Sequence, residues 1–127
     1  MRFITLFLLV LPFFIKAQNC SSPGSTAQTA TVICSSNTFF QSNISSCFGP
    51  TIPFAGCAGW SFNADNAAWY SFHCYATGAL GFLLTPLGPA DDYDWAVYDV
   101  TGISFAQFFS GGHEISVNLS GNTGPTG

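Results

Sequence analysis

Between residues 69 and 119 the chain repeatedly alternates apolar and polar positions, the period of a half-buried β-strand. Turn residues separate the alternating stretches, with Thr77-Gly78 after the first and Thr101-Gly102 after the third. Short strands at this spacing predict an all-β fold, an antiparallel β-sandwich. The four expected strands are Trp69–Tyr75, Ala79–Thr85, Asp94–Val100 and His113–Leu119.

The preceding part, residues 19–60, differs in amino-acid composition. It is rich in Ser, Thr, Pro and Gly, which predicts loops rather than a packed sheet. Within it we expect only short strands, at Thr31–Cys34, Thr38–Gln41 and near Ile52–Phe54. Elsewhere, weak helical spacing of apolar residues occurs at Ser104–Phe109.

Residues 1–18 have the pattern of a secretory signal peptide. Arg2 precedes an apolar run from Phe3 to Ile15, which is too short to span a bilayer, and a polar, small-residue stretch follows. We therefore expect one domain over residues 19–127, loop-rich over 19–60 and with its core strands over 61–127. The last residues have turn composition without a closing strand, so we expect the domain to be incomplete at its C-terminus.

The net charge of the chain limits the classes of molecule that it can bind. The whole chain has a formal charge of −4, and both basic residues, Arg2 and Lys16, belong to the expected signal. The remainder carries six acidic residues and a charge of −6. Nucleic-acid binding depends on cationic side chains, so this composition argues against it. Cations, neutral glycans and proteins remain as partners, and no membrane span is expected after signal cleavage.

All five cysteines lie beyond the signal: Cys20, Cys34, Cys47, Cys57 and Cys74. In an exported chain such residues are disulfide candidates, and an odd number leaves one over. The pairing does not follow from the spacing. No Cys-x-x-Cys pair is present, which disfavours a zinc site.

Four of the six acidic residues fall between positions 91 and 99. Asp91, Asp92 and Asp94 are candidate Ca²⁺ ligands because Ca²⁺ binds carboxylate and carbonyl oxygens on loops. The alternative is that these residues form a turn, with side chains that accept hydrogen bonds from nearby backbone N–H groups. Asp99 falls on the opposite strand face from Asp94 and is a poor candidate ligand.

Aromatic residues supply the other candidate site. Tyr93 and Trp95 adjoin the aspartates, and a ring stacked on a sugar beside hydroxyl-accepting carboxylates is one way to bind a glycan. The alternative is that they fill the core, as aromatic residues of small β-domains usually do. His73 is expected to lie at the surface or to stack on an aromatic ring, and His113 is expected to begin a strand. No nucleophile motif is present. We therefore expect a protein that is not an enzyme.

The residues from 66 onwards resemble the β-sandwich domains found near the N-terminus of large secreted surface proteins of gliding bacteria. More distantly, the chain is similar to prepeptidase C-terminal domains and to CUB modules. One departure is that the family commonly has Cys-Asn-Trp-Ser-Gly where this chain has Val117–Gly121. The missing cysteine accounts for the odd count. The shared segments are Asn66–Phe72, Gly78–Phe82, Thr85-Pro86, Asp91–Trp95, Tyr98–Gly102 and Ser120–Gly127.

The resemblance implies a jelly-roll or CUB-like sandwich in a gliding-motility-associated protein. Such proteins carry PKD-type repeats and a sorting domain for type IX secretion, which implies location outside the cell or on its outer surface. The expected function is a non-catalytic adhesion or interaction module, stabilised by Ca²⁺ if the aspartates bind it. Its partners would be neighbouring domains, other surface proteins or glycans. Two alternatives are a structural spacer and a carbohydrate-binding accessory domain of a secreted hydrolase.

Overall fold

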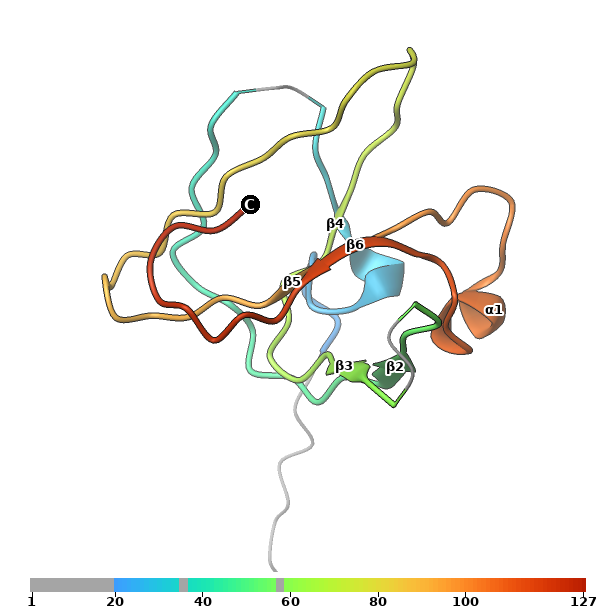
Figure 1. Cartoon of the computed structure of the whole chain (residues 1–127), viewed down its shortest axis with the longest axis horizontal. Helices are drawn as coiled ribbons and strands as arrows, with labels where there is room; N and C mark the ends of the chain where they lie inside the picture. Colours follow the sequence, from blue (N-terminus) through green and yellow to red (C-terminus); the bar gives the residue numbers. More distant parts are fainter. Residues whose placement is uncertain (1–19, 35–36, 57–58) are drawn as a thin grey trace, which may run out of the picture.

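A computed structural model describes residues 20–34, 37–56 and 59–127, and the expected signal peptide lies outside these ranges (Figure 1). The described chain is β-rich, with six short strands in three two-stranded sheets and two short helices. None of the helices in these ranges is long and apolar enough to cross a membrane. The elements in chain order are η1 (Ala27–Thr29), β1 (Thr31–Val32), β2 (Thr51–Pro53), β3 (Ser61–Asn63), β4 (Tyr70–Ser71), β5 (Trp95–Tyr98), α1 (Phe105–Phe109) and β6 (Glu114–Asn118).

Two of the three sheets are antiparallel. In one, β2 pairs with β3, and Ile52 lies opposite Phe62. In the other, β5 pairs with β6, and the register shifts between Val97 and Tyr98. The third sheet pairs β1 with β4 in parallel, so the expectation of a purely antiparallel fold is wrong. Parallel neighbours need a long connection, which here contains the β2–β3 hairpin.

The strands are shorter than the alternating pattern predicted. The stretches Trp69–Tyr75, Asp94–Val100 and His113–Leu119 contain β4, β5 and β6, whereas Ala79–Thr85 forms only one bridge, between Leu84 and Thr126. Thr38–Gln41 forms no strand either. Alternation determines which face a side chain takes, but a strand also needs a partner for its backbone N–H and C=O groups, and these two segments have none along most of their length.

The weak helical spacing at Ser104–Phe109 corresponds to a short helix, α1. Ser104 caps it, because its hydroxyl oxygen accepts the Gln107 N–H. Gln107 makes a second, reciprocal hydrogen bond, because its side-chain oxygen accepts the Ser104 N–H at 2.9 Å. This reciprocal capping box satisfies backbone donors that a short helix otherwise leaves unpaired. Local chemistry therefore explains why so few residues form a helical turn in a β-rich chain.

The buried hydrophobic core is small and centres on α1 and the β2–β3 hairpin. Phe108 is 3% exposed and meets two aromatic rings edge-on, Trp69 at 5.9 Å and Tyr98 at 4.9 Å between ring centroids. Helix α1 itself lies against β2. Gly111, just beyond α1, has φ +87 and sits where any Cβ would meet the Pro53 carbonyl. The buried hydrophobic residues are Cys47, Ile52, Phe54, Ala64 and Phe108.

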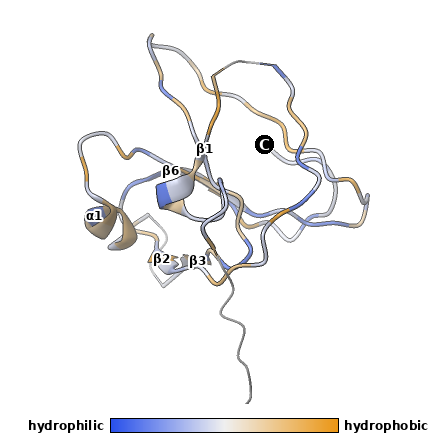
Figure 2. Cartoon of the chain, turned by 180° about the vertical axis from the view of Figure 1, so that it is seen from behind, coloured by the Kyte–Doolittle hydropathy of each residue, from blue (hydrophilic) through white to orange (hydrophobic). Residues whose placement is uncertain are grey.

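One disulfide, Cys20–Cys47, ties the start of the domain to the segment before β2. This confirms the expectation of a disulfide for two of the five cysteines. Cys34 and Cys74 are exposed and unbonded, and Cys57 lies outside the described residues. Large apolar side chains stay exposed along the extended segments, where Figure 2 shows hydrophobic colouring away from the small sheets.

Replacing Phe108 by Ala should lower the free energy of unfolding by about 3 to 5 kcal/mol, because a buried ring is lost and a cavity remains. Phe105→Ala is the matched control, since Phe105 lies on the same helix but is 47% exposed. It should cost about 1 kcal/mol or less. Urea unfolding measures both values. Equal losses in the two variants would contradict the central position of Phe108.

Candidate functional site

The three aspartates of the candidate Ca²⁺ site are all exposed. Asp91 closes the loop before it: its carboxylate accepts the Gly88 N–H at 3.2 Å, and its own N–H donates to the Gly88 carbonyl at 3.0 Å. The backbone carbonyl of Asp91 accepts the Gly124 N–H at 3.0 Å, which holds the chain end against this corner. These contacts agree with the turn-forming role that was the alternative to metal binding.

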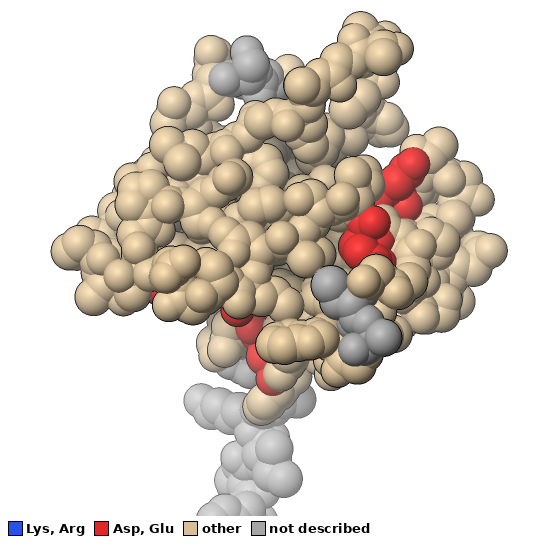
Figure 3. All heavy atoms as spheres, in the orientation of Figure 1, with Lys and Arg blue, Asp and Glu red and all other residues tan. Residues whose placement is uncertain are grey.

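Within the described ranges, no group of three or more His, Cys, Asp or Glu side chains is arranged to hold a metal ion. On the face drawn in Figure 3, the acidic side chains of the described residues lie in more than one place and do not form a single patch. Calcium binding by Asp91, Asp92 and Asp94 stays a prediction that the geometry leaves untested.

The two aromatic candidates are half-buried. The Trp95 indole N–H donates to the Thr126 hydroxyl at 3.1 Å, and its ring meets Phe82 edge-on at 4.9 Å. Trp95 therefore joins β5 to two flanking segments. Glycan binding by Tyr93 and Trp95 stays a prediction. Tyr93 lies beside the exposed aspartates.

The remaining charged candidates have local partners. Asp99 accepts hydrogen bonds from the side chain and then the backbone N–H of Thr101, which lower the pKa of its carboxyl. The His113 carbonyl accepts the Asp99 N–H at 2.9 Å, extending the β5–β6 pairing. His73 is exposed and its ring lies 6.2 Å from that of Tyr75, in agreement with the expected surface role.

Glu114, the first residue of β6, makes a connection that the sequence reasoning missed. One carboxylate oxygen, Oε1, accepts the N–H groups of Ala55 at 2.6 Å and Gly56 at 2.8 Å. These bonds tie β6 to the turn of the β2–β3 hairpin. Its one visible signal was that Glu114 is the only glutamate in the chain.

Hydrogen bonding and burial shift the pKa values of two neighbouring groups in opposite directions. The Gly56 N–H is the largest cause of a lowered Glu114 pKa, partial burial opposes it, and other backbone N–H groups, including that of Ala55, add to the lowering. Burial raises the pKa of Tyr98, the cross-strand partner of Glu114, to about 12, and the Glu114 charge adds to the rise. Within the described part, the Tyr98 hydroxyl and Glu114 Oε2 are enclosed without hydrogen-bond partners.

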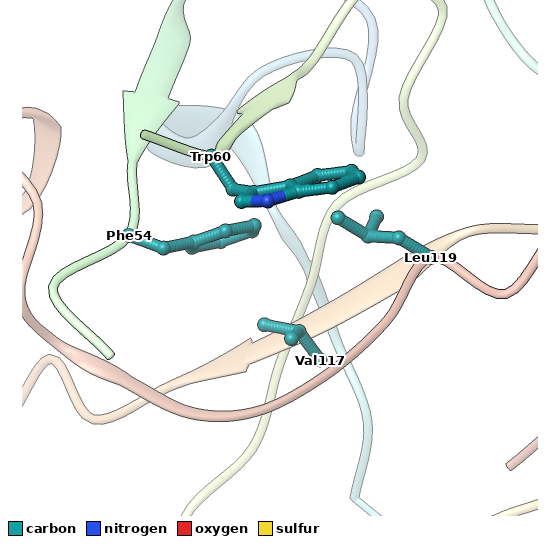
Figure 4. A pocket seen from close by; sticks show the side chains of 4 residues that line it. All are labelled: Phe54, Trp60, Val117 and Leu119. Carbon is teal, nitrogen blue, oxygen red and sulfur yellow. The ribbon is translucent and has the colours of Figure 1, made fainter. Parts of the chain in front are cut away.

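The hairpin and β6 also enclose an apolar hollow, which we call the Trp60 notch. Phe54 and Trp60 line it from the hairpin side, and Val117 and Leu119 line it from β6 and the residue after it (Figure 4). Its volume is about 210 Å³. Phe54 is buried, whereas Trp60 is 63% exposed, so the indole forms an accessible wall. This notch is a candidate binding site of the described chain.

Comparison with known protein families, with curated proteins and with solved structures finds no match. The resemblance to surface domains of gliding bacteria therefore stays a prediction. The function has to be argued from the site itself.

The lowered Glu114 pKa makes stability depend on pH. The folded state holds a proton on Glu114 less tightly than the unfolded chain, so unfolding takes up a proton in the window between the two pKa values. The stabilisation is present above the ordinary glutamate pKa of about 4.3 and is lost as the pH falls through the lower folded-state value. Glu114→Gln should lower stability by about 1 kcal/mol at neutral pH, because neutral acceptors bond more weakly.

Urea unfolding across this pH range measures the effect. The slope of unfolding free energy against pH should be smaller in Glu114→Gln than in the wild type, and a remainder from Asp99 should persist. Identical slopes in wild type and Glu114→Gln would show that the hairpin contact does not depend on charge.

Proposed function

We propose that this chain is a non-catalytic interaction module of an exported surface protein and that it binds through apolar and aromatic side chains at its surface. The observation that carries the proposal is that few hydrophobic side chains are buried and many large ones are exposed. Among the residues that the structure describes, five hydrophobic residues are buried, whereas fifteen large hydrophobic residues are between 40% and 95% exposed. Exposed apolar surface on this scale marks a surface that contacts a partner.

Charge supports a neutral or apolar partner. The described ranges contain all six acidic residues, and both basic residues of the chain lie outside them. An anionic ligand would meet repulsion that no Lys or Arg offsets. Neutral glycans and apolar protein surfaces meet no such penalty.

The Trp60 notch is the part of this surface best shaped to receive a ligand. Phe54 and Val117 line the apolar hollow, and the exposed Trp60 indole lies at the edge of the hollow with a flat aromatic face. Aromatic faces bury large area at low entropic cost and are therefore frequent anchors at interfaces. A pyranose ring stacked on Trp60 is the occupant that we propose when the partner is a neutral glycan.

The sandwich architecture is part of this proposal. Across the notch, apolar residues of the β2–β3 hairpin face those of the β5–β6 sheet, as the inner faces of two packed sheets do. Helix α1 covers one end of that contact through Phe108. These contacts support two sheets that pack face to face in an exported domain held by disulfides.

Retention on neutral polysaccharides tests the proposal. Beads that carry the chain without its signal peptide should be retained on a surface coated with neutral polysaccharide. Trp60→Ala should weaken this retention about tenfold, because one stacked ring is lost. Phe48→Ala is the control, because Phe48 is 87% exposed but lies outside the notch. Release of soluble sugar during the incubation would contradict a non-catalytic role.

Two further outcomes bear on the same proposal. Equal loss in Trp60→Ala and Phe48→Ala would place binding on the apolar surface in general rather than at the notch, and absence of retention would exclude the glycan. Running the assay with Ca²⁺ and with a chelator tests Asp91, Asp92 and Asp94. If these residues bind the ion, Ca²⁺ should strengthen retention of the wild type, and Asp94→Asn should lose that gain. An equal gain in Asp94→Asn would contradict the assignment.

A further inference from the structure

The parallel pair β1–β4 brings two unbonded cysteines to the same end of one small sheet. Thr31 is in register with Tyr70, and Val32 with Ser71. The last backbone bond joining the two segments runs from the Ile33 N–H to the Ser71 carbonyl, at 2.8 Å. Because the pair is parallel, both segments leave this bond in the same direction.

Cys34 follows that bond by one residue on the first segment, and Cys74 follows it by three residues on the second. Both side chains are exposed, and neither is bonded to another cysteine. We propose that Cys34 and Cys74 form a second disulfide, which locks the ends of β1 and β4 together. This inference is independent of the proposed function.

The register gives the two residues suitable spacing. Continued by two steps beyond the last pair, Val32 and Ser71, it sets Cys34 opposite His73, the immediate neighbour of Cys74. Adjacent strands lie about 4.8 Å apart, so a one-residue diagonal spans about 6 Å between Cα atoms. Disulfides bridge Cα separations of about 4.4 to 6.8 Å.

A strict pleat would point Cys34 and Cys74 to opposite faces of the sheet. That constraint does not apply here, because the strands end at Val32 and Ser71 and neither cysteine lies in a strand. Phe72 and His73 are exposed, so no packed side chain holds the backbone of this segment in one orientation. The proposal therefore requires the backbone to rotate after Ser71, so that the Cys74 thiol reaches the face that carries Cys34.

The competing partner is Cys57, whose own position lies outside the described residues. The nearest described residues before and after it belong to the β2–β3 turn; they are Gly56 and Gly59. Glu114 holds Gly56 to β6. In Figures 1 and 2, this hairpin lies on the opposite side of β5–β6 from the segments that leave β1 and β4. The described residues nearest to Cys57 in the sequence therefore lie away from the pair, and the proposal assigns Cys57 as the odd cysteine.

The bond forms by thiol–disulfide exchange with a disulfide oxidant, such as oxidised glutathione or the catalytic disulfide of an oxidoreductase. One protein thiolate attacks a sulfur of the oxidant, which releases one thiol and leaves a mixed disulfide. The second protein thiolate attacks the protein sulfur of that mixed disulfide and releases the other thiol. The two protein thiols are oxidised by two electrons, and the oxidant is reduced to two thiols.

The cross-link would interlock two loops. Cys34 lies inside the loop that Cys20–Cys47 closes, whereas Cys74 lies outside it. The second bond would therefore connect the N-terminal loop to β4 covalently, across a pairing that is now held by few hydrogen bonds. It would also fix the exposed segment that carries Phe39 and Phe40 at both of its ends.

The full chain, refolded from the reduced state in a glutathione redox buffer, provides the test. After acid quenching and alkylation, one reactive thiol should remain of the five cysteines. Lys and Arg occur only at positions 2 and 16, so trypsin cannot separate the cysteines, and pepsin is the suitable protease. Peptide mapping should find Cys34 linked to Cys74 and the alkyl group on Cys57.

Three variants sharpen the result. Cys57→Ser should leave no reactive thiol and keep the wild-type melting temperature. Cys34→Ser and Cys74→Ser should each leave two reactive thiols and lower the melting temperature by more than about 8 °C, as expected for loss of a disulfide that closes a long loop. Three reactive thiols in the wild type, or peptides that link Cys57 to either residue, would overturn the proposal. The wild-type peptide map decides even if a variant does not fold.

Discussion

The structure depends on the burial of one phenylalanine. Each of its sheets has only two strands, and isolated two-stranded pairings are marginally stable in water. Phe108 contacts Trp69, which precedes β4, and Tyr98, the last residue of β5, while its helix lies against β2. Helix α1 and its one buried ring thus connect all three sheets, which lets weak local pairings reinforce one another.

The candidate site follows from the same arrangement. Because α1 fixes β2 close to β5 and β6, the hairpin turn comes within hydrogen-bond distance of Glu114, and the Trp60 notch opens beside it. Burial raises the pKa of Tyr98, and the negative charge of the Glu114 carboxylate adds to this rise. The core contact and the proposed binding surface are therefore parts of one unit.

The sequence predicted what depends on neighbours along the chain. Period-2 alternation located β4, β5 and β6, and the spacing of apolar residues located α1, which the Ser104 cap explains. Alternation failed at Ala79–Thr85 because strand formation there needed a partner, which the pattern does not reveal. Asp91 accepts a local bond, as the turn alternative held, but Glu114 acts on residues 58 and 59 positions away, and no local pattern reports such a contact.

Native-state hydrogen exchange tests most directly whether the three sheets form one cooperative unit. Each sheet offers a reporter amide: Ile33 donates to Ser71, Phe54 to Trp60, and Asp99 to His113. If Phe108 couples the sheets, these three amides should exchange through the same opening reaction, with equal free energies that fall together as denaturant is added. Three different opening free energies, each with its own dependence on denaturant, would show that the sheets unfold independently and would contradict this account.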